Sequence, residues 1–358
     1  MRFFFLFLFP SLHCSPVNSQ TAINDSSQQS LTISAYGEFY YSYDFSRPFN
    51  SEKSNFVYSH KRHNEISANL IYVKANYKKQ NYRANLGAMV GTYTEYNLAS
   101  EPTWAQFIYE ANAGMKLSQK YNLWLDIGIM PSHLGFESAV GGDCWNLTRS
   151  LLAEGSPYYE AGAKLSYTSK NEKLYASFLL LNGWQRIRKP TAISDLPSIG
   201  FQVQYKPKDR WILNYGNFIG SAQPDSLNAL RHFHNVYIQY ESPKKWGLIL
   251  GFDLGIDKYN PTDYRLWYSP VVILRYKWTS CWSAAARLEY YFDKQGIIFP
   301  TLSPNGFQTF GASLNQDYKI NNHIKFRLEY KYLQSKDAIF NNQNERNHSI
   351  TSACIFSF

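Results

Sequence analysis

The sequence has little charge and no long apolar segment. Only 18% of its 358 residues are charged, whereas 17% are aromatic, with 29 Tyr, 24 Phe and 9 Trp. Average globular domains have roughly 25% charged residues, and disordered chains combine high charge with few aromatic residues. After the first residues, no apolar run approaches the ~18 residues of a membrane-spanning helix. The composition therefore excludes a disordered chain and a helical membrane protein.

Cysteine is scarce as well. The chain has 4 Cys, at positions 14, 144, 281 and 354. They form no Cys-x-x-Cys pair and no Cys/His ligand spacing, so we expect no structural disulfide and no metal site. The sequence also has no glycine-rich phosphate loop and no His-Glu-x-x-His motif, and we expect no cofactor.

Positive charge exceeds negative charge, with 36 Lys and Arg against 27 Asp and Glu. A clustered basic patch would indicate nucleic-acid binding. Here the basic residues are scattered, either at alternating positions or in tight turns such as Lys206 and Lys208. We therefore expect no nucleic-acid partner, because turn lysines close to a membrane surface instead meet lipid phosphates.

The first residues read as an export signal. Arg2 precedes the apolar run Phe3 to Phe9, and small or tolerated residues follow at the usual cleavage offsets. This pattern predicts a secretory signal peptide over residues 1–19, too short to span a bilayer. A lipoprotein signal ending at Cys14 fits less well, because the bulky His13 precedes the cysteine. We expect residues 20–30 to form a polar periplasmic linker.

From residue 31 to residue 358, one pattern repeats. Between positions 323 and 333, apolar and charged side chains alternate, which places them on opposite faces of a strand. Sixteen segments of this kind follow one another, with a phase slip near Ile71 and Tyr72 that indicates a bulge. The segments are 31–44, 64–78, 81–95, 107–118, 121–130, 157–169, 172–184, 198–206, 209–220, 233–242, 245–257, 266–278, 281–293, 307–319, 322–334 and 347–358.

The connections between these segments alternate in length. A tight polar turn follows every even segment, and a longer loop follows every odd one. This layout is typical of an outer-membrane β-barrel with short periplasmic turns and longer extracellular loops. A soluble all-β protein is the alternative, but its loop lengths need not alternate. We therefore predict an all-β fold: a transmembrane antiparallel β-barrel of about 16 strands, with outer-membrane lipid and lipopolysaccharide as its surroundings.

The C-terminal strand ends in an aromatic residue. Phe356 and Phe358 resemble the insertion signal that the outer-membrane barrel-assembly machinery reads. We therefore expect this machinery to be a partner, and we expect the protein to lie in the outer membrane of a Gram-negative bacterium.

A barrel of this size encloses an aqueous lumen instead of a core filled with side chains, and the inward-facing positions are polar. Both signs of charge occur there in similar numbers, so the sequence does not predict ion preference. The pore wall is expected to include Arg275, Arg287, Glu289, Lys325, Arg327 and Glu329.

The third loop, residues 131–156, is the longest and is unusually apolar. Phe136 and Trp145 lie in it, together with Leu147, Leu151 and Leu152 at helical spacing. An exposed loop rarely carries such residues, so we expect this loop to fold inward and narrow the pore. The candidate constriction residues are Glu137, Asp143, Arg149 and Glu154 in the loop, with Glu160, Lys164, Glu110 and Arg83 facing them.

The stretch 122–187, which includes this loop, resembles the OmpL-like β-barrel porins of Bacteroidota. The segments ISAYGEFYYSYDF (33–45) and HNEISANLIYVKANY (63–77) are similar to that family too. The resemblance covers essentially the whole chain after the signal segment. It implies an outer-membrane porin and does not specify a substrate.

The leading hypothesis is a water-filled channel for passive diffusion of small polar solutes or ions. The alternative is a non-conducting barrel with a structural, adhesive or ligand-gated role. An enzyme would need a nucleophile and a base within reach of each other. His232 and His234 could bind a metal, but the sequence shows no third ligand. Asp253 and Asp257 share the lumen side and could do acid–base work, but solvated wall charges explain them better. We therefore predict no enzymatic activity. The sequence leaves both a homotrimer and a monomer open.

Overall fold

The computed structural model describes residues 30–189, 196–221, 230–258, 262–340 and 344–358. The predicted signal peptide and all of the predicted linker except its last residue lie outside the described residues. Ser30 belongs to the first strand, so the barrel begins one residue before the predicted boundary.

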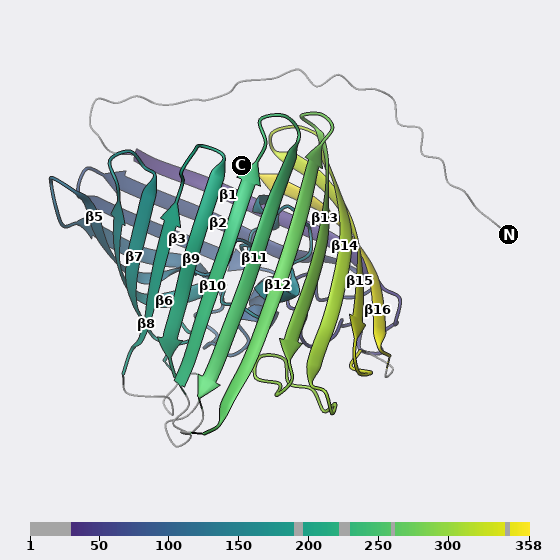
Figure 1. Cartoon of the computed structure of the whole chain (residues 1–358). Coiled ribbons are helices and arrows are strands. Elements are labelled where there is room, and N and C mark those ends of the chain that lie inside the picture. The colour runs from purple at the N-terminus through teal and green to yellow at the C-terminus, as the bar shows by residue number, and fades with distance from the viewer. Residues whose placement is uncertain (1–29, 190–195, 222–229, 259–261, 341–343) are drawn as a thin grey trace.

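The chain forms a closed barrel in which every strand pairs antiparallel with its neighbours in sequence, and β1 also pairs with β16 (Figure 1). The predicted 16-stranded antiparallel barrel is therefore confirmed. The strands are β1 (Ser30–Asp44), β2 (Ile66–Lys79), β3 (Tyr82–Val90), β4 (Ile108–Lys116), β5 (Asn122–Pro131), β6 (Tyr159–Thr168), β7 (Leu174–Leu181), β8 (Ser198–Tyr205), β9 (Trp211–Gly220), β10 (Leu230–Glu241), β11 (Trp246–Lys258), β12 (Tyr264–Lys277), β13 (Trp282–Asp293), β14 (Phe307–Lys319), β15 (Ile324–Ser335) and β16 (Arg346–Ser357).

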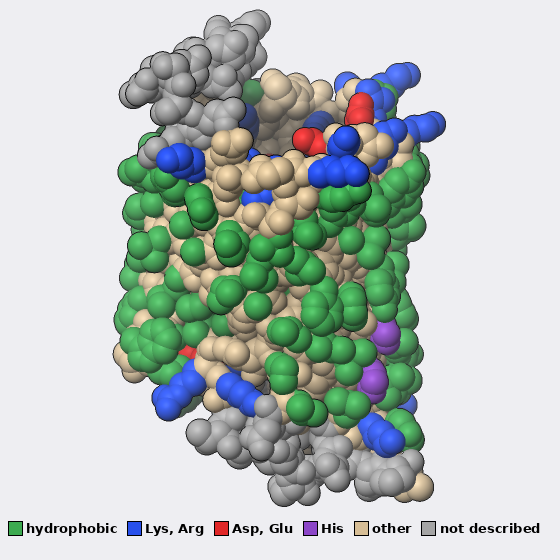
Figure 2. Space-filling view, turned by 90° about the vertical axis from the view of Figure 1, so that its left-hand side faces the viewer, with side chains coloured by type: hydrophobic (Ala, Val, Ile, Leu, Met, Phe, Trp, Pro, Cys, Tyr) green, Lys and Arg blue, Asp and Glu red, His purple; other side chains and the backbone are tan. Residues whose placement is uncertain are grey.

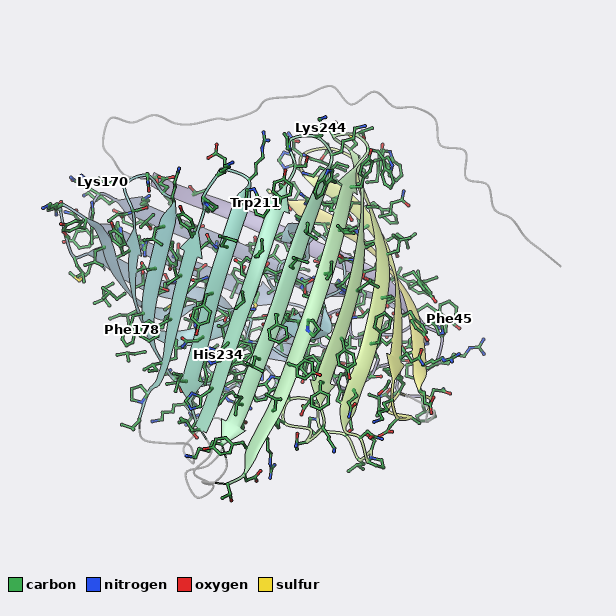
Figure 3. All side chains as sticks on the ribbon, in the orientation of Figure 1. Phe45, Lys170, Phe178, Trp211, His234 and Lys244 are labelled. Carbon is green, nitrogen blue, oxygen red and sulfur yellow. The ribbon has the colours of Figure 1, made fainter. Side chains whose placement is uncertain are left out.

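The two ends of the barrel differ in their connections. The connection between β2 and β3 consists of residues 80–81, whereas the one between β1 and β2 spans residues 45–65. We call the end with short connections the turn rim and the opposite end the loop rim. Lys170 and Lys244 lie at the turn rim (Figure 3). The described parts of the loops contain three short helices: α1 (Thr92–Asn97), η1 (Gly141–Asp143) and α2 (Leu151–Glu154).

Side chains alternate between the two faces of the wall, as the period of two predicts. On β15, Leu328 and Tyr330 point outward and are 42% and 43% exposed, whereas Arg327 and Glu329 point inward and are fully buried. On the face shown in Figure 2, apolar side chains predominate between the rims, and Lys and Arg lie near both rims. No helix among the described residues is long and apolar enough to cross a membrane.

Two local expectations need correction. The segment predicted as 81–95 ends at Val90, because Gly91 adopts a φ of +128° and the chain then turns into α1. A Cβ atom at Gly91 would lie 2.6 Å from the backbone oxygen of Asn69. The bulge in β2 falls at Asn69, not at Ile71 and Tyr72, because the pairing with β1 steps from Leu70 to Ala68.

Candidate functional site

The loop between β5 and β6 lies inside the barrel. We call residues 132–158 the interior loop. The amide of Gly135 donates to the side chain of Asn235 on β10 at 3.1 Å, and the amide of Gly142 donates to the Tyr36 hydroxyl on β1 at 2.9 Å. Strands β1 and β10 are widely separated around the ring. The interior loop therefore crosses the lumen.

Wall glycines make room for the large side chains of the interior loop. A Cβ atom at Gly251 would lie 2.5 Å from the ring of Phe136, and one at Gly247 would lie 2.6 Å from the ring of Trp145. Both glycines are on β11. Because protein interiors are packed to high density, the loop can approach this wall only where side chains are missing.

Only part of the segment in which Leu147, Leu151 and Leu152 have helical spacing forms a helix. The amides of Leu147 and Thr148 donate to the side chains of Asn315 and Glu329, at 3.2 and 2.6 Å. These amides bind the wall, so the helix α2 begins only at Leu151. The Ser150 side chain caps it by accepting from the Ala153 amide at 3.1 Å.

A buried charge cluster joins the interior loop to β13 and β15. The guanidinium of Arg287 donates to the Thr148 carbonyl at 2.7 Å. It also lies 3.2 Å from Glu329, 3.4 Å from Glu289 and 3.6 Å from Glu137. Buried charges of this kind are tolerated only when they are paired and hydrogen-bonded. The cluster therefore fixes the loop against this wall.

Three basic residues of β15 bind backbone carbonyls of the interior loop. Arg327 donates to Gly141 at 2.7 Å, Lys325 donates to Gly142 at 2.9 Å, and Lys331 donates to Arg149 at 2.9 Å. On β12, the Arg275 guanidinium lies 4.0 Å from the centre of the Trp145 ring.

The six residues predicted to form the pore wall do point inward, but they lie beneath the interior loop. Four of them are buried, and the other two are half-buried. The buried four are Arg287, Glu289, Arg327 and Glu329. These residues anchor the interior loop, whereas we expected them to face the water of the pore.

The four predicted constriction residues of the loop have separate environments. Arg149 is buried and donates to three loop carbonyls, those of Ser138, Ala139 and Leu147, at 2.7 to 3.1 Å. Glu137 accepts hydrogen bonds from the amide and the hydroxyl of Ser150. Asp143 is exposed.

Glu154, the fourth, binds the first loop of the barrel. Its carboxylate accepts from the amides of Tyr58 and Ser59, at 2.9 and 3.3 Å. Burial raises the pKa of Glu154 to about 7, although these two amides oppose the shift. The carboxyl therefore titrates close to neutral pH.

The four predicted residues on the facing wall are divided among separate pairs. Arg83 donates to Asp126 at 2.6 Å, and Glu110 lies 3.2 Å from Lys74. Glu160 pairs with His133 of the loop, and Lys164 is half-buried. The eight candidates are thus distributed over the loop and the wall and have different partners.

His133 fastens the start of the interior loop. Its Nδ1 lies 2.8 Å from Glu160, and its Nε2 lies 2.7 Å from the Asn217 carbonyl oxygen. Because both ring nitrogens face acceptors, both must donate, which requires the charged imidazolium. Burial disfavours this charge, but Glu160 and the carbonyl outweigh it, and the pKa of His133 is raised.

Cavities lie on both sides of the interior loop, and two of them are large enough to hold a small solute. The outer cavity, of about 260 Å³, is bordered by Glu154 and Ser156 of the loop and by Trp184 and Arg231. The inner cavity, of about 190 Å³, is bordered by Pro157 and Tyr158 and by other residues of the loop and wall. The segment 154–158 thus lies between the two cavities. The turn rim is hollowed (Figure 2).

The sequence did not reveal that the first loop also folds inward. Phe56 lies 4.8 Å from Phe307 and 5.9 Å from Phe340 between ring centres, within a buried cluster at the loop rim. The His60 ring contacts the buried Glu38 carboxylate of β1. The available sequence signal was the apolar run Phe56, Val57 and Tyr58 in an otherwise largely polar stretch, and all three residues belong to or pack against this cluster.

The residue pairs considered for enzymatic chemistry lie apart from one another. His232 and His234 are on the outer face of β10, and His234 lies 2.8 Å from the Tyr215 hydroxyl. Asp253 accepts from Ser156, and Asp257 binds Arg231. Within the described ranges, no group of three or more His, Cys, Asp or Glu is arranged to hold a metal ion.

The sequence model of the family described as "Putative beta-barrel porin-2, OmpL-like" matches residues 30–358. The fold is similar to several solved structures at low sequence identity. The anion-selective porin from Comamonas acidovorans has 9% identity and a TM-score of 0.61, covering 92% of this chain and 100% of that chain. The outer membrane channel DcaP of Acinetobacter baumannii has 10% identity and a TM-score of 0.59, covering 94% and 99%.

A third similar structure is a trimer form of OmpT, an outer membrane protein of Vibrio cholerae. It has 9% identity and a TM-score of 0.58, covering 93% of this chain and 100% of that chain. A comparison with curated proteins found no match.

Proposed function

The chain belongs to the OmpL-like family of β-barrel porins, and from this membership we propose that it is a diffusion channel for small polar solutes or ions. Membership places it in the outer membrane, with the loop rim taken as the extracellular end. In this proposal the third loop, 131–156, is the constriction. The observation that carries it is a loop bound to β1 and β10 across the lumen, with a cavity on each side.

Selectivity would arise where the two cavities approach each other. Glu154 borders the outer cavity and Glu137 borders the inner one. Both are among the predicted constriction residues. The other predicted residues of the wall, such as Arg83 and Glu110, would act on the turn-rim side of the loop through the charge they present to the lumen.

The test is single-channel conductance of the refolded mature chain in a planar bilayer, repeated with residues 138–153 deleted. We expect stable conductance that rises on deletion, because the deletion removes most of the loop that crosses the lumen. An intact chain that forms a heat-modifiable barrel but conducts no ions would contradict the proposal.

The second candidate function is a non-conducting barrel with a structural, adhesive or ligand-gated role. It is favoured by the dense packing on the β13 to β15 side, where Arg287, Arg327 and Glu329 are fully covered. The same bilayer experiment separates the two candidates, because a plugged barrel conducts only after the deletion.

Export and assembly complete the proposal. Residues 1–19 would be removed as a signal peptide, residues 20–30 would be the periplasmic linker, and N-terminal sequencing of the membrane form tests the cleavage site. Phe356 and Phe358 would be read by the assembly machinery. Because one similar structure is a trimer form, we propose a homotrimer, which chemical crosslinking in the membrane would detect.

A further inference from the structure

The inner cavity has an unusually aromatic lining. It lies between the interior loop and the inner wall, and its volume is about 190 Å³. Five of its residues are tyrosines, which come from the wall, the loop and α1: Tyr93, Tyr109, Tyr158, Tyr159 and Tyr237. An apolar cavity of about 150 Å³ is large enough for benzene. A single six-membered ring therefore fits here.

The rings in this cavity meet at steep angles. Tyr93 and Tyr158 have ring centres 6.0 Å apart and planes inclined by 81°. Phe136 and Tyr237 have centres 5.7 Å apart and planes inclined by 64°. Rings packed edge to face leave some faces uncovered by each other. Such faces accept the C–H groups of a bound solute and bury its apolar surface.

Two residues that border the cavity each have a buried polar atom without a hydrogen-bond partner. The hydroxyl of Tyr158 has none, and neither has Oε1 of Glu137. The Arg287 guanidinium is 3.6 Å from Glu137, beyond hydrogen-bond distance. A buried polar atom without a hydrogen bond costs about 1–3 kcal/mol. One is a donor and the other an acceptor, and a solute with several hydroxyl groups satisfies both.

The lining also limits the charge of the solute. No Lys, Arg or His borders the inner cavity among the described residues. An anion would therefore find no direct cationic partner there, and it would meet the Glu137 carboxylate. A quaternary ammonium ion would contact the rings, but it would leave the Tyr158 hydroxyl unpaired.

We propose that the inner cavity is a binding site for a neutral sugar ring, a pyranose held by tyrosine faces and by Tyr158 and Glu137. This inference rests on the proposed function, because the solute reaches the cavity through the lumen. It gives the channel a preferred solute class, since a site built to bond hydroxyl groups rejects analogues that lack them.

The experiment is an equilibrium titration of the refolded full chain with glucose, in which calorimetry measures binding. The protein is kept in a polyoxyethylene detergent, which has no sugar headgroup. Cyclohexanol and tetramethylammonium serve as probes with one hydroxyl and with a positive charge. We expect saturable binding of glucose and at least tenfold weaker binding of the other two. Equal binding of cyclohexanol, stronger binding of tetramethylammonium, or no glucose binding would overturn the proposal.

The variant that tests the site is Tyr158→Phe. It removes a hydroxyl that bonds to nothing in the protein, so the barrel should fold and unfold as before. Glucose affinity should fall about tenfold, as for the loss of one hydrogen bond. Tyr58→Phe, on the border of the outer cavity, is the matched control and should leave affinity unchanged. Unchanged affinity in Tyr158→Phe would refute the assignment.

Binding in detergent does not require conduction. A chain that binds glucose but passes no ions in the bilayer would refute the channel and keep the site. A chain that conducts but binds no glucose would keep the channel and refute the site.

Discussion

Arg287 and Glu329 lie 3.2 Å apart inside the barrel and hold the same residue of the interior loop. Arg287 donates to the Thr148 carbonyl, and Glu329 accepts from the Thr148 amide. Both charged side chains are fully buried. The wall therefore binds both the backbone N–H and the backbone C=O of Thr148. The main role of the Arg287–Glu329 pair is to set the position of the interior loop.

Replacing Arg287 should release the loop. Arg287→Gln leaves the carboxylates of Glu289 and Glu329 without their guanidinium, and breaking a buried pair costs about 3–5 kcal/mol. We expect a lower free energy of unfolding in urea and a higher single-channel conductance. Arg265→Gln is the control, because its pair with Asp263 is partly exposed and exposed pairs contribute about 0–1 kcal/mol. Equal effects of the two variants would contradict this role.

Gly251 should be sensitive to the smallest added side chain. In Gly251→Ala the new methyl group would lie 2.5 Å from the Phe136 ring and 2.9 Å from Val271. Overpacking of this kind costs about 1–3 kcal/mol, and the ring would have to move into the inner cavity. We expect lower stability in urea and reduced conductance. Gly37→Ala, where the nearest atom is 3.3 Å away on the Phe39 side chain, should change neither.

The barrel itself was predictable because its signals are local. Alternation along each strand and the length of each connection depend only on neighbouring residues, and predicted segments such as 307–319 agree with the structure at both ends. One exception, the end of β3, depends on Gly91, which has a φ of +128° and lies so close to Asn69 of β2 that a Cβ atom would clash with its backbone oxygen. This close approach joins residues that are distant in sequence and cannot be read from a period of two.

The site was less predictable because it depends on contacts between distant segments. The inward fold of the third loop was foreseen from its apolar residues. The burial of Arg287 and Arg327 was not, because it arises from loop carbonyls more than 130 residues away in sequence. The same holds for Glu154, whose partners are the amides of Tyr58 and Ser59.

Stability should depend on pH through Glu154. Burial raises its pKa to about 7 in the folded protein, above the ordinary value near 4.3. A raised carboxyl pKa means that the folded state holds the proton more tightly than the unfolded state does. The protonated Glu154 side chain therefore contributes fully to the free energy of unfolding below pH 4.3. This contribution is lost as pH rises to about 7, and its size is on the order of 3 kcal/mol.

The measurement is urea unfolding of the wild type and of Glu154→Gln between pH 4 and pH 9. The glutamine keeps an acceptor for the Tyr58 amide but cannot ionise, so the variant should lose less stability over this range and exceed the wild type at pH 8. Glu95→Gln, at an exposed position of α1, should follow the wild type. A Glu154→Gln profile parallel to the wild type would contradict the assignment.

Phe358 should matter for assembly more than for stability. Its backbone completes the pairing of β16 with β1 through two hydrogen bonds to Ala35, of 2.9 and 3.0 Å, and these do not depend on the side chain. The ring is 70% exposed and stacks on His323 with ring centres 5.6 Å apart. Phe358→Ala should therefore change the free energy of unfolding of the refolded barrel by less than about 1 kcal/mol.

In cells, the same substitution should reduce the amount of barrel in the outer membrane several-fold if the terminal ring is read during insertion. Trp246→Ala is the matched control, since Trp246 is an exposed aromatic residue at the turn-rim end of β11. Immunoblots of outer-membrane fractions, compared with unfolding of the same variants refolded in detergent, separate recognition from stability. If Phe358→Ala inserts at the wild-type level, or if both variants lose insertion equally, the terminal phenylalanine is not the signal.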